Sequence, residues 1–202
     1  LSSNAFAADA YKFGVFPYLP PTKLNSLFSP ITKDLSEALG KDIHLSSKPS
    51  YAEFSEQLSL EVFDIAFVQP FDYVAAHDKY NYLPLARRSE DLKAIIVVNK
   101  DSPLQALQDL RGKIIANPPV SAAVTHLTSM ALMGVGIDPE KDVTRDYGKS
   151  HFSCMQRVLI GSADACGTAG QALFHFEKKD MKGRFRVLHE TQAIPHSLFV
   201  VH

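Results

Sequence analysis

The feature that most constrains the fold is a strand that ends at a proline turn and leads directly into a helix. A buried strand is predicted over Ile65–Gln69, Pro70 turns the chain, and a helix follows over Phe71–His77. A similar strand–turn–helix arrangement occupies Lys113–Thr125. In open α/β sheets, ligands bind beyond the carboxyl ends of strands, where helix N-termini offer free N–H groups to an anion. Two such places in one small chain predict two lobes with a ligand cleft between them.

The composition excludes several classes of function. The chain has 202 residues, of which 46% are hydrophobic and 21% charged, and its formal net charge is −1. No block of Lys and Arg stands out, which argues against nucleic acid or an anionic membrane surface as a partner. No apolar run approaches the roughly 18 residues that a membrane span requires. The composition therefore predicts an ordinary globular protein with a sizeable core.

Strands and helices alternate along the chain, and this alternation predicts the fold class. Strands are expected at Tyr11–Phe16, Ile43–Ser47, Ile65–Gln69, Leu83–Arg87, Lys93–Asn99, Lys113–Asn117, Val143–Tyr147, Ala163–Thr168, Arg184–Glu190 and Leu198–Val201. Helices are expected at Lys23–Leu39, after the capping box Ser50–Glu53, and at Phe71–His77, Val120–Met133, Phe152–Ile160 and Gln171–Lys179. Alternation of this kind predicts an α/β fold with mostly parallel sheets and helices on both faces.

We expect the chain to cross twice between the lobes. The pattern breaks near residues 88–100 and returns near 187–198. These crossings give a first lobe of residues 11–92 plus 191–202 and a second lobe of residues 93–190. The chain stops in mid-strand at Val201-His202, from which we expect the native protein to continue.

The first ten residues differ from the rest of the chain. Residues 1–10 are small and polar, with Ala-Phe-Ala at positions 5–7. This pattern matches the end of a secretory signal peptide with an A-x-A cleavage site, although the charged and apolar parts of a signal are absent. The alternative is a disordered start of the chain.

Cys154 and Cys166 are the two cysteines of the chain, and three interpretations are open for them. In an exported protein an even count favours a disulfide. In a reducing compartment both would be small buried residues. The third interpretation is a redox or soft-ligand sensing role. Without a Cys-x-x-Cys or a nearby pair of histidines, neither cysteine indicates a metal site.

An ordered series of motifs resembles the phosphate/phosphonate-type periplasmic substrate-binding proteins. The series consists of Phe13-Gly-Val-Phe-Pro-Tyr, Phe28-Ser-Pro-Ile, Leu35 to Gly40, Phe63-Asp-Ile-Ala-Phe-Val-Gln-Pro, Leu110-Arg-Gly-Lys-Ile-Ile-Ala and Ile194-Pro-His-Ser. The resemblance covers about residues 11–202. It implies a type II periplasmic binding fold that closes around a small oxyanion. Such proteins deliver a ligand to an ABC transporter or serve as the sensor domain of a signalling protein.

The resemblance also implies ligand-binding residues. Tyr51 matches a tyrosine that the family uses after the second strand, and Tyr73 matches one near the third strand's end. Where the family commonly has Ser-Thr-Ser at a helix start, this chain has Val120-Ser-Ala, so Ser121 remains with Thr125 one turn on. Ser150-His151 matches a pair that precedes the next helix. The smaller number of hydroxyls suits a softer, less charged or larger anion than a phosphonate.

The residues themselves support the same set and extend it. Ser121 and His151 are expected at helix starts, where a hydroxyl and an imidazole could bind an anion, or could merely cap the helix. Tyr18, Tyr51 and Tyr73 could each supply a phenolic donor, or could pack in the core. Gln69 and Thr168 end predicted strands and could point towards a ligand, or could be a turn residue and a buried strand end.

Nothing in the sequence indicates catalysis or a bound cofactor. The chain has no Gly-x-Ser-x-Gly elbow, P-loop, Gly-x-Gly-x-x-Gly or His-Glu-x-x-His motif. We therefore expect a non-enzymatic, periplasmic or membrane-tethered binding protein that captures a phosphonate- or phosphate-like oxyanion for the membrane permease of an ABC transporter. The alternative is the extracytoplasmic sensor domain of a histidine kinase or similar receptor, fused to a signalling module and specific for a sulfur or arsenic oxyanion.

Overall fold

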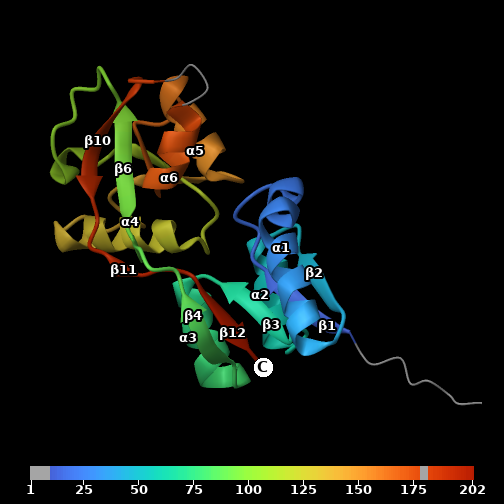
Figure 1. Cartoon of the computed structure of the whole chain (residues 1–202). Coiled ribbons are helices and arrows are strands. Elements are labelled where there is room, and N and C mark those ends of the chain that lie inside the picture. Colours follow the sequence, from blue (N-terminus) through green and yellow to red (C-terminus); the bar gives the residue numbers. More distant parts are fainter. Residues whose placement is uncertain (1–9, 178–181) are drawn as a thin grey trace, which may run out of the picture. The chain divides into compact units, whose positions relative to one another are not determined.

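The computed structural model describes residues 10–177 and 182–202 (Figure 1). Within this part, the chain forms two compact units. Unit 1 runs up to Arg88 and includes His196–His202, and unit 2 consists of Ser89–Pro195. The expected signal-peptide remnant, residues 1–10, lies outside the described residues except for Ala10.

In unit 1, five strands of the described chain form one sheet in the order β2-β1-β3-β12-β4. These strands are β1 (Tyr11–Val15), β2 (Ile43–Ser47), β3 (Ile65–Val68), β4 (Leu83–Arg87) and β12 (Leu198–Val201). Strand β1 is parallel to β2 and β3, whereas β12 is antiparallel to β3 and β4. The expected C-terminal strand is thus an interior strand of the unit 1 sheet.

Each parallel strand of unit 1 leads into a helix. Helix α1 (Pro21–Leu39) follows β1, α2 (Tyr51–Ser59) follows β2, and α3 (Pro70–Tyr80) follows β3. Because these strands are parallel, the three helix N-termini face the same edge of the sheet. Prolines begin α1 and α3, at positions where a missing N–H breaks no helical hydrogen bond.

The predicted capping box of α2 is half right. The Ser50 hydroxyl accepts a hydrogen bond from the Glu53 N–H at 3.2 Å, as expected for an N-cap. However, the Glu53 carboxylate accepts from the Ser50 hydroxyl at 2.9 Å rather than from the Ser50 backbone. The cap itself holds the start of α2 next to the carboxyl end of β2.

An aromatic cluster fills the core of unit 1. The rings of Phe13, Phe28, Phe67 and Phe199 come from β1, α1, β3 and β12, and their centroids lie 4.8 to 6.5 Å apart. Such contacts bury large apolar area and stabilise the sheet against α1. This core holds the strand ends in fixed positions.

In unit 2, another five strands of the described chain form a sheet in the order β10-β6-β9-β7-β8. They are β6 (Ala94–Asn99), β7 (Ile114–Asn117), β8 (Thr144–Tyr147), β9 (Ala165–Ala169) and β10 (Phe185–Glu190). Strand β7 is parallel to β8 and β9, and β6 is antiparallel to β9 and β10. The helices are α4 (Ala123–Gly134), α5 (His151–Leu159) and α6 (Gly170–Glu177), with a 3-10 helix η1 at Leu107–Leu110.

The side chains of β6 show that the unit 2 sheet is covered on both faces. Its residues Ile95 and Val97 join a core cluster with Cys154 and Phe176 of α5 and α6. Its alternate residues Ile96 and Val98 join a second cluster that includes Leu132 of α4. Side chains alternate between the faces of a strand, so a continuous apolar run reports burial on both sides.

Each sheet has two parallel and two antiparallel pairs of neighbours among the described strands. The sequence predicted mostly parallel sheets, whereas half of the neighbouring strand pairs in each observed sheet are antiparallel. The antiparallel pairs involve β6 and β12, which follow the short strands β5 (Asp91–Leu92) and β11 (Ile194–Pro195) rather than a helix. A parallel neighbour needs a crossover connection, and these two strands do not have one.

A short ladder that the sequence did not predict pairs β5 (Asp91–Leu92) with β11 (Ile194–Pro195). It lies where the chain enters unit 2 and where it leaves that unit. The boundaries expected from the sequence, 92/93 and 190/191, would instead assign both strands to the first lobe.

Candidate ligand-binding site

In unit 1, three of the predicted residues lie near one another at the carboxyl edge of the parallel strands. Tyr18 follows β1, and its ring packs on Phe16 with a centroid distance of 4.8 Å. Tyr51 is the first residue of α2 and is buried, and Gln69 is the buried N-cap residue of α3. Tyr73 lies one turn into α3 and is half-buried, with its ring against His77.

The two tyrosines of this edge stay protonated at neutral pH. Burial raises the pKa of Tyr51, and the nearby Asp72 and Tyr18 raise it further. Burial also raises the pKa of Tyr18, while the positive charge of Arg88 opposes the shift. Both phenols therefore remain neutral hydrogen-bond donors, and Arg88 contributes positive charge on the Tyr18 side.

Sequence reasoning missed Asp72, which stands in the first turn of α3. Its Oδ1 accepts a hydrogen bond from the Ser55 hydroxyl at 3.2 Å, and Gln69 also donates to the carboxylate. Burial raises the pKa of Asp72, although these two hydrogen bonds partly offset the shift. The signal that could have found it is an acidic residue between the aromatic residues Phe71 and Tyr73.

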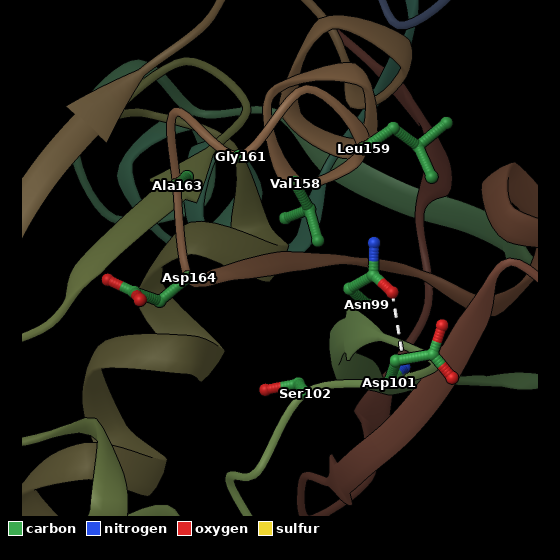
Figure 2. Close-up of a pocket in the computed structure, with 8 residues that line it drawn as sticks. All are labelled: Asn99, Asp101, Ser102, Val158, Leu159, Gly161, Ala163 and Asp164. Carbon is green, nitrogen blue, oxygen red and sulfur yellow. Dashed lines mark hydrogen bonds between the residues drawn. The ribbon is translucent and has the colours of Figure 1, made fainter.

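Unit 2 has a surface pocket that does not fit an anion (Figure 2). Its lining includes Asp101 and Asp164, and Asp164 lies at the amino-terminal end of β9, away from that strand's carboxyl end. The Asp164 carboxylate already accepts from the Ile114 N–H at 2.8 Å. Two carboxylates would repel an anionic ligand, which favours the other edge of the sheet for an anion site.

That other edge is formed by the carboxyl ends of β7, β8 and β9. The predicted helix Val120–Met133 begins three residues too early, because α4 begins at Ala123 with Ala122 as its N-cap. The Ala122 N–H donates to the Pro119 carbonyl at 2.9 Å, which makes a turn of residues 119–122 before the helix. Ser121 is therefore half-buried in that turn, one residue before the N-cap of α4.

Thr125 holds the same turn in place. It is buried, and its hydroxyl lies 3.1 Å from the Pro119 carbonyl and 3.4 Å from that of Pro118. A hydroxyl that donates to these carbonyls fixes the entry into α4. A direct contact between Thr125 and a ligand stays a prediction.

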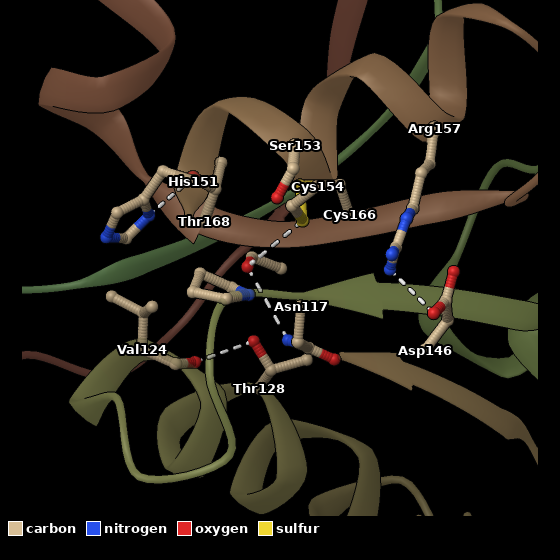
Figure 3. The surroundings of a disulfide bond; sticks show 12 residues. Asn117, Val124, Thr128, Asp146, His151, Ser153, Cys154, Arg157, Cys166 and Thr168 are labelled. Carbon is tan, nitrogen blue, oxygen red and sulfur yellow. Dashed lines mark hydrogen bonds and ion pairs between the residues drawn. A yellow bond between two sulfur atoms is a disulfide. The ribbon is translucent and has the colours of Figure 1, made fainter. Parts of the chain in front are cut away.

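Ser150 and His151 form the start of α5. Ser150 is the N-cap: its hydroxyl accepts from the Ser153 N–H at 3.2 Å, and the Ser153 hydroxyl accepts from the Ser150 N–H at 3.1 Å. His151 is the first helical residue, and its Nδ1 lies 2.9 Å from the Thr168 hydroxyl of β9 (Figure 3). Burial lowers the pKa of His151 to about 4. The structure thus brings two predicted residues, His151 and Thr168, into direct contact.

Asn117, at the end of β7, is a second residue that sequence reasoning missed. It is fully buried, its Nδ2 lies 3.5 Å from the Gly167 carbonyl, and its Oδ1 has no hydrogen-bond partner within the described chain. A carboxamide followed by proline lies at a strand end in both units: Asn117 is the last residue of β7 before Pro118, and Gln69-Pro70 directly follows β3. That repeated pair was the signal in the sequence.

A disulfide joins Cys154 of α5 to Cys166 of β9 (Figure 3). Both residues are fully buried. The bond connects the helix that carries His151 to the strand that carries Thr168. Within residues 10–177 and 182–202, no three His, Cys, Asp or Glu side chains gather in a way that could hold a metal ion.

Comparison with known proteins decides the family. The sequence profile described as "ABC transporter, phosphonate, periplasmic substrate-binding protein" matches residues 13–202, which is nearly the whole chain. The chain belongs to this family. Among the described helices, none combines the length and hydropathy that crossing a membrane requires.

Individual relatives of this phosphonate-family chain are distant in sequence. The phosphonates-binding periplasmic protein of Escherichia coli (strain K12) is 27% identical over 109 residues, which are 52% of this chain and 32% of that protein. The alignment therefore spans about a third of the length of this relative.

Solved structures share the fold. The PhnD1 protein of Prochlorococcus marinus, in complex with methylphosphonate, superimposes with a TM-score of 0.82 over 95% of this chain and 76% of its own, at 19% identity. A phosphonate-transporter binding protein from Pseudomonas aeruginosa superimposes with a TM-score of 0.79 over 95% of this chain and 68% of its own, also at 19% identity. The aliphatic sulphonate binding protein SsuA of Escherichia coli superimposes with a TM-score of 0.67 over 96% of this chain and 65% of its own, at 15% identity. The chain has the type II periplasmic binding fold that these proteins share.

Proposed function

We propose that the protein is an extracytoplasmic solute-binding protein that captures a small oxyanion for the permease of an ABC transporter. The observation that carries the proposal is the start of α5, where Ser150 caps the helix and His151 stands beside Thr168 at the end of a parallel strand. A helix N-terminus offers free N–H groups and a favourable dipole to an anion. The family assignment supports the same function.

We propose one set of ligand-contacting residues in each unit. The unit 1 residues are Tyr18, Tyr51, Gln69 and Tyr73, and the unit 2 residues are Ser121, Thr125, Ser150, His151 and Thr168. Most of these groups are neutral hydrogen-bond donors. Such donors can replace the hydration shell of an oxyanion without requiring the ligand to carry one particular charge. The methylphosphonate and sulphonate ligands named for the matched structures define the first compounds to test.

We propose a periplasmic location, in line with the family description. Three of the matched proteins named above are described as binding proteins of a transporter or of the periplasm. No observation favours the alternative of a sensor domain with a fused signalling module. A transport role predicts that the ligand-loaded protein stimulates ATP hydrolysis by its cognate permease complex.

The ligand class can be tested by thermal unfolding of the purified chain with phosphate, phosphite, methylphosphonate, longer alkylphosphonates, sulfate and an alkylsulphonate. A ligand present at 100 times its dissociation constant stabilises a protein by about 2.7 kcal/mol, which a melting curve resolves. We expect at least one of these oxyanions to raise the melting temperature. If none of them does, the oxyanion proposal is wrong.

Two variants make the test specific to unit 2. Ser121→Ala should weaken binding of the active oxyanion roughly tenfold, since it removes one hydrogen-bond donor to a charged ligand. Ser162→Ala is the matched control: its exposed hydroxyl bonds to the Arg157 carbonyl near the amino-terminal end of β9. Equal affinities of the two variants would exclude Ser121 from the site.

A further inference from the structure

The contact between His151 and Thr168 has a chemical consequence for the ligand. A neutral imidazole carries its proton on one ring nitrogen only, and the hydrogen bond at the other nitrogen decides which. The His151 Nδ1 lies 2.9 Å from Thr168 Oγ1. Either Nδ1 donates to the hydroxyl, or the hydroxyl donates to Nδ1.

Burial of Thr168 distinguishes these two arrangements. Its side chain is fully buried, and His151 is the hydrogen-bond partner that the described residues give to its hydroxyl. If Nδ1 donated, the Thr168 O–H would have no acceptor, and folded proteins avoid buried donors without partners. The hydroxyl therefore donates, Nδ1 accepts, and the ring proton resides on Nε2, which points away from Thr168 (Figure 3).

The pair is held by the packing of α5 on β9. His151 and Cys154 are three residues apart on the helix and share a face, and Cys166 and Thr168 are two residues apart on the strand and share a face. The disulfide and the hydrogen bond are therefore two links across one helix–strand contact. The hydrogen bond restricts the rotation of the imidazole, and the disulfide joins the helix to the strand.

The surroundings of His151 favour an uncharged ring. His151 is the first residue of α5, where the helix dipole disfavours a cation. Strands β6, β7 and β9, which pack on α5, carry no ionisable side chain other than the bonded Cys166. Helix α6, which also packs on α5, carries His175 and Glu177, and α5 itself carries Arg157. Burial lowers the pKa of His151 to about 4.

We propose that Thr168 is a positioning residue that fixes His151 as an uncharged Nε2–H donor to the ligand. This inference rests on the proposed function, since it assumes that His151 contacts an oxyanion. It narrows the ligand class: the atom facing His151 must be a hydrogen-bond acceptor, such as an unprotonated oxygen of a phosphonate or sulphonate. A ligand that presents a hydroxyl there would lose this contact.

The tautomer can be measured without any ligand. Long-range ¹H–¹⁵N spectra of the ¹⁵N-labelled chain distinguish protonated from unprotonated imidazole nitrogens, and His151→Asn assigns the signals. We expect Nε2 to be protonated in the natural protein and in Thr168→Ser. In Thr168→Val the Nδ1 partner is lost, and we expect the signals to move towards a mixture of tautomers. A protonated Nδ1 in the natural protein, or an unchanged tautomer in Thr168→Val, would overturn the proposal.

Affinity for methylphosphonate provides the second readout. Thr168→Val should weaken its binding roughly three- to tenfold, the range expected for one lost hydrogen bond, and Thr168→Ser should restore it. Thr32→Val is the matched control, because Thr32 is a buried threonine of α1 whose hydroxyl bonds to the Ser29 carbonyl. Equal affinity of Thr168→Val and Thr32→Val would overturn the positioning role. If methylphosphonate does not bind but the Nε2–H tautomer is present, the tautomer assignment is supported and the ligand class is overturned.

Discussion

The hydroxyl of Ser55 in α2 donates to one carboxylate oxygen of Asp72 in α3, at 3.2 Å, while the other oxygen of Asp72 is buried without a hydrogen-bond partner in the described chain. The bond links two helices whose N-termini face the same sheet edge. When one oxygen of a buried carboxylate lacks a hydrogen-bond partner, ionising that carboxylate costs free energy. Burial accordingly raises the pKa of Asp72.

Replacing Asp72 by Asn should stabilise the protein at neutral pH. A folded-state pKa above the unfolded value means that the folded state binds the proton more tightly, so stability falls as pH rises through the folded pKa. Asn has nearly the same side-chain shape as Asp but carries no charge, so the free-energy cost of the buried negative charge is removed. Thermal unfolding at pH 4 and pH 7 should show an advantage for the variant that grows with pH. Asp78→Asn, at an exposed position of the same helix, serves as control, and a lower melting temperature for Asp72→Asn at pH 7 would contradict the argument.

The pKa of His151 predicts the opposite pH dependence. Its folded value of about 4 lies below the unfolded value of about 6.5, so its contribution to stability is complete above pH 6.5 and is lost as pH falls towards 4. These values correspond to about 2 kcal/mol of stability lost between pH 7.5 and pH 5. The difference in unfolding free energy between the natural protein and His151→Gln should narrow by that amount. His77→Gln, at an exposed site of α3, controls for loss of a histidine, and a constant difference would argue against burial of His151.

The sequence predicted the strands and helices well where apolar periodicity is strong. Strand β2 at Ile43–Ser47 and strand β12 at Leu198–Val201 have the predicted bounds. It failed for the β5–β11 ladder, because two-residue strands carry no periodic signal. It also could not show that β6 and β12 run antiparallel to their neighbours, since direction depends on where a strand enters the sheet.

The candidate site was predictable only in part, for a related reason. Hydroxyl and aromatic residues near strand ends could be selected by type, and Tyr51, His151 and Thr168 were selected in this way. The His151–Thr168 bond joins residues 17 positions apart on different elements, so no local pattern reveals it. Asp72 and Asn117 were missed because their importance comes from burial, and burial of a polar residue becomes visible only in the folded chain.

Gly167 should tolerate no side chain. A Cβ at this position would lie 2.3 Å from Thr128 Oγ1 and 2.6 Å from Asn117 Nδ2, closer than such atoms can approach. Gly167→Ala should therefore destabilise the protein by about 1–3 kcal/mol, the usual cost of overpacking. Gly134→Ala, at the last residue of α4 with nothing within 4 Å, is the matched control and should be neutral or stabilising by up to about 1 kcal/mol. Chemical denaturation measures both, and equal stabilities would mean that the close approach at Gly167 is absent.

Loss of the disulfide should destabilise the protein and loosen α5. The bond closes a loop with a sequence separation of 12 residues, for which chain entropy predicts a contribution of about 3 kcal/mol. The double variant Cys154→Ala, Cys166→Ala should lose roughly this much unfolding free energy in urea. Addition of a reductant should lower the stability of the natural protein to a similar level and leave the double variant unchanged. Because both cysteines are fully buried, the reductant should act only after unfolding begins. A natural protein whose urea midpoint is insensitive to reductant under full equilibration would show that the bond adds no stability.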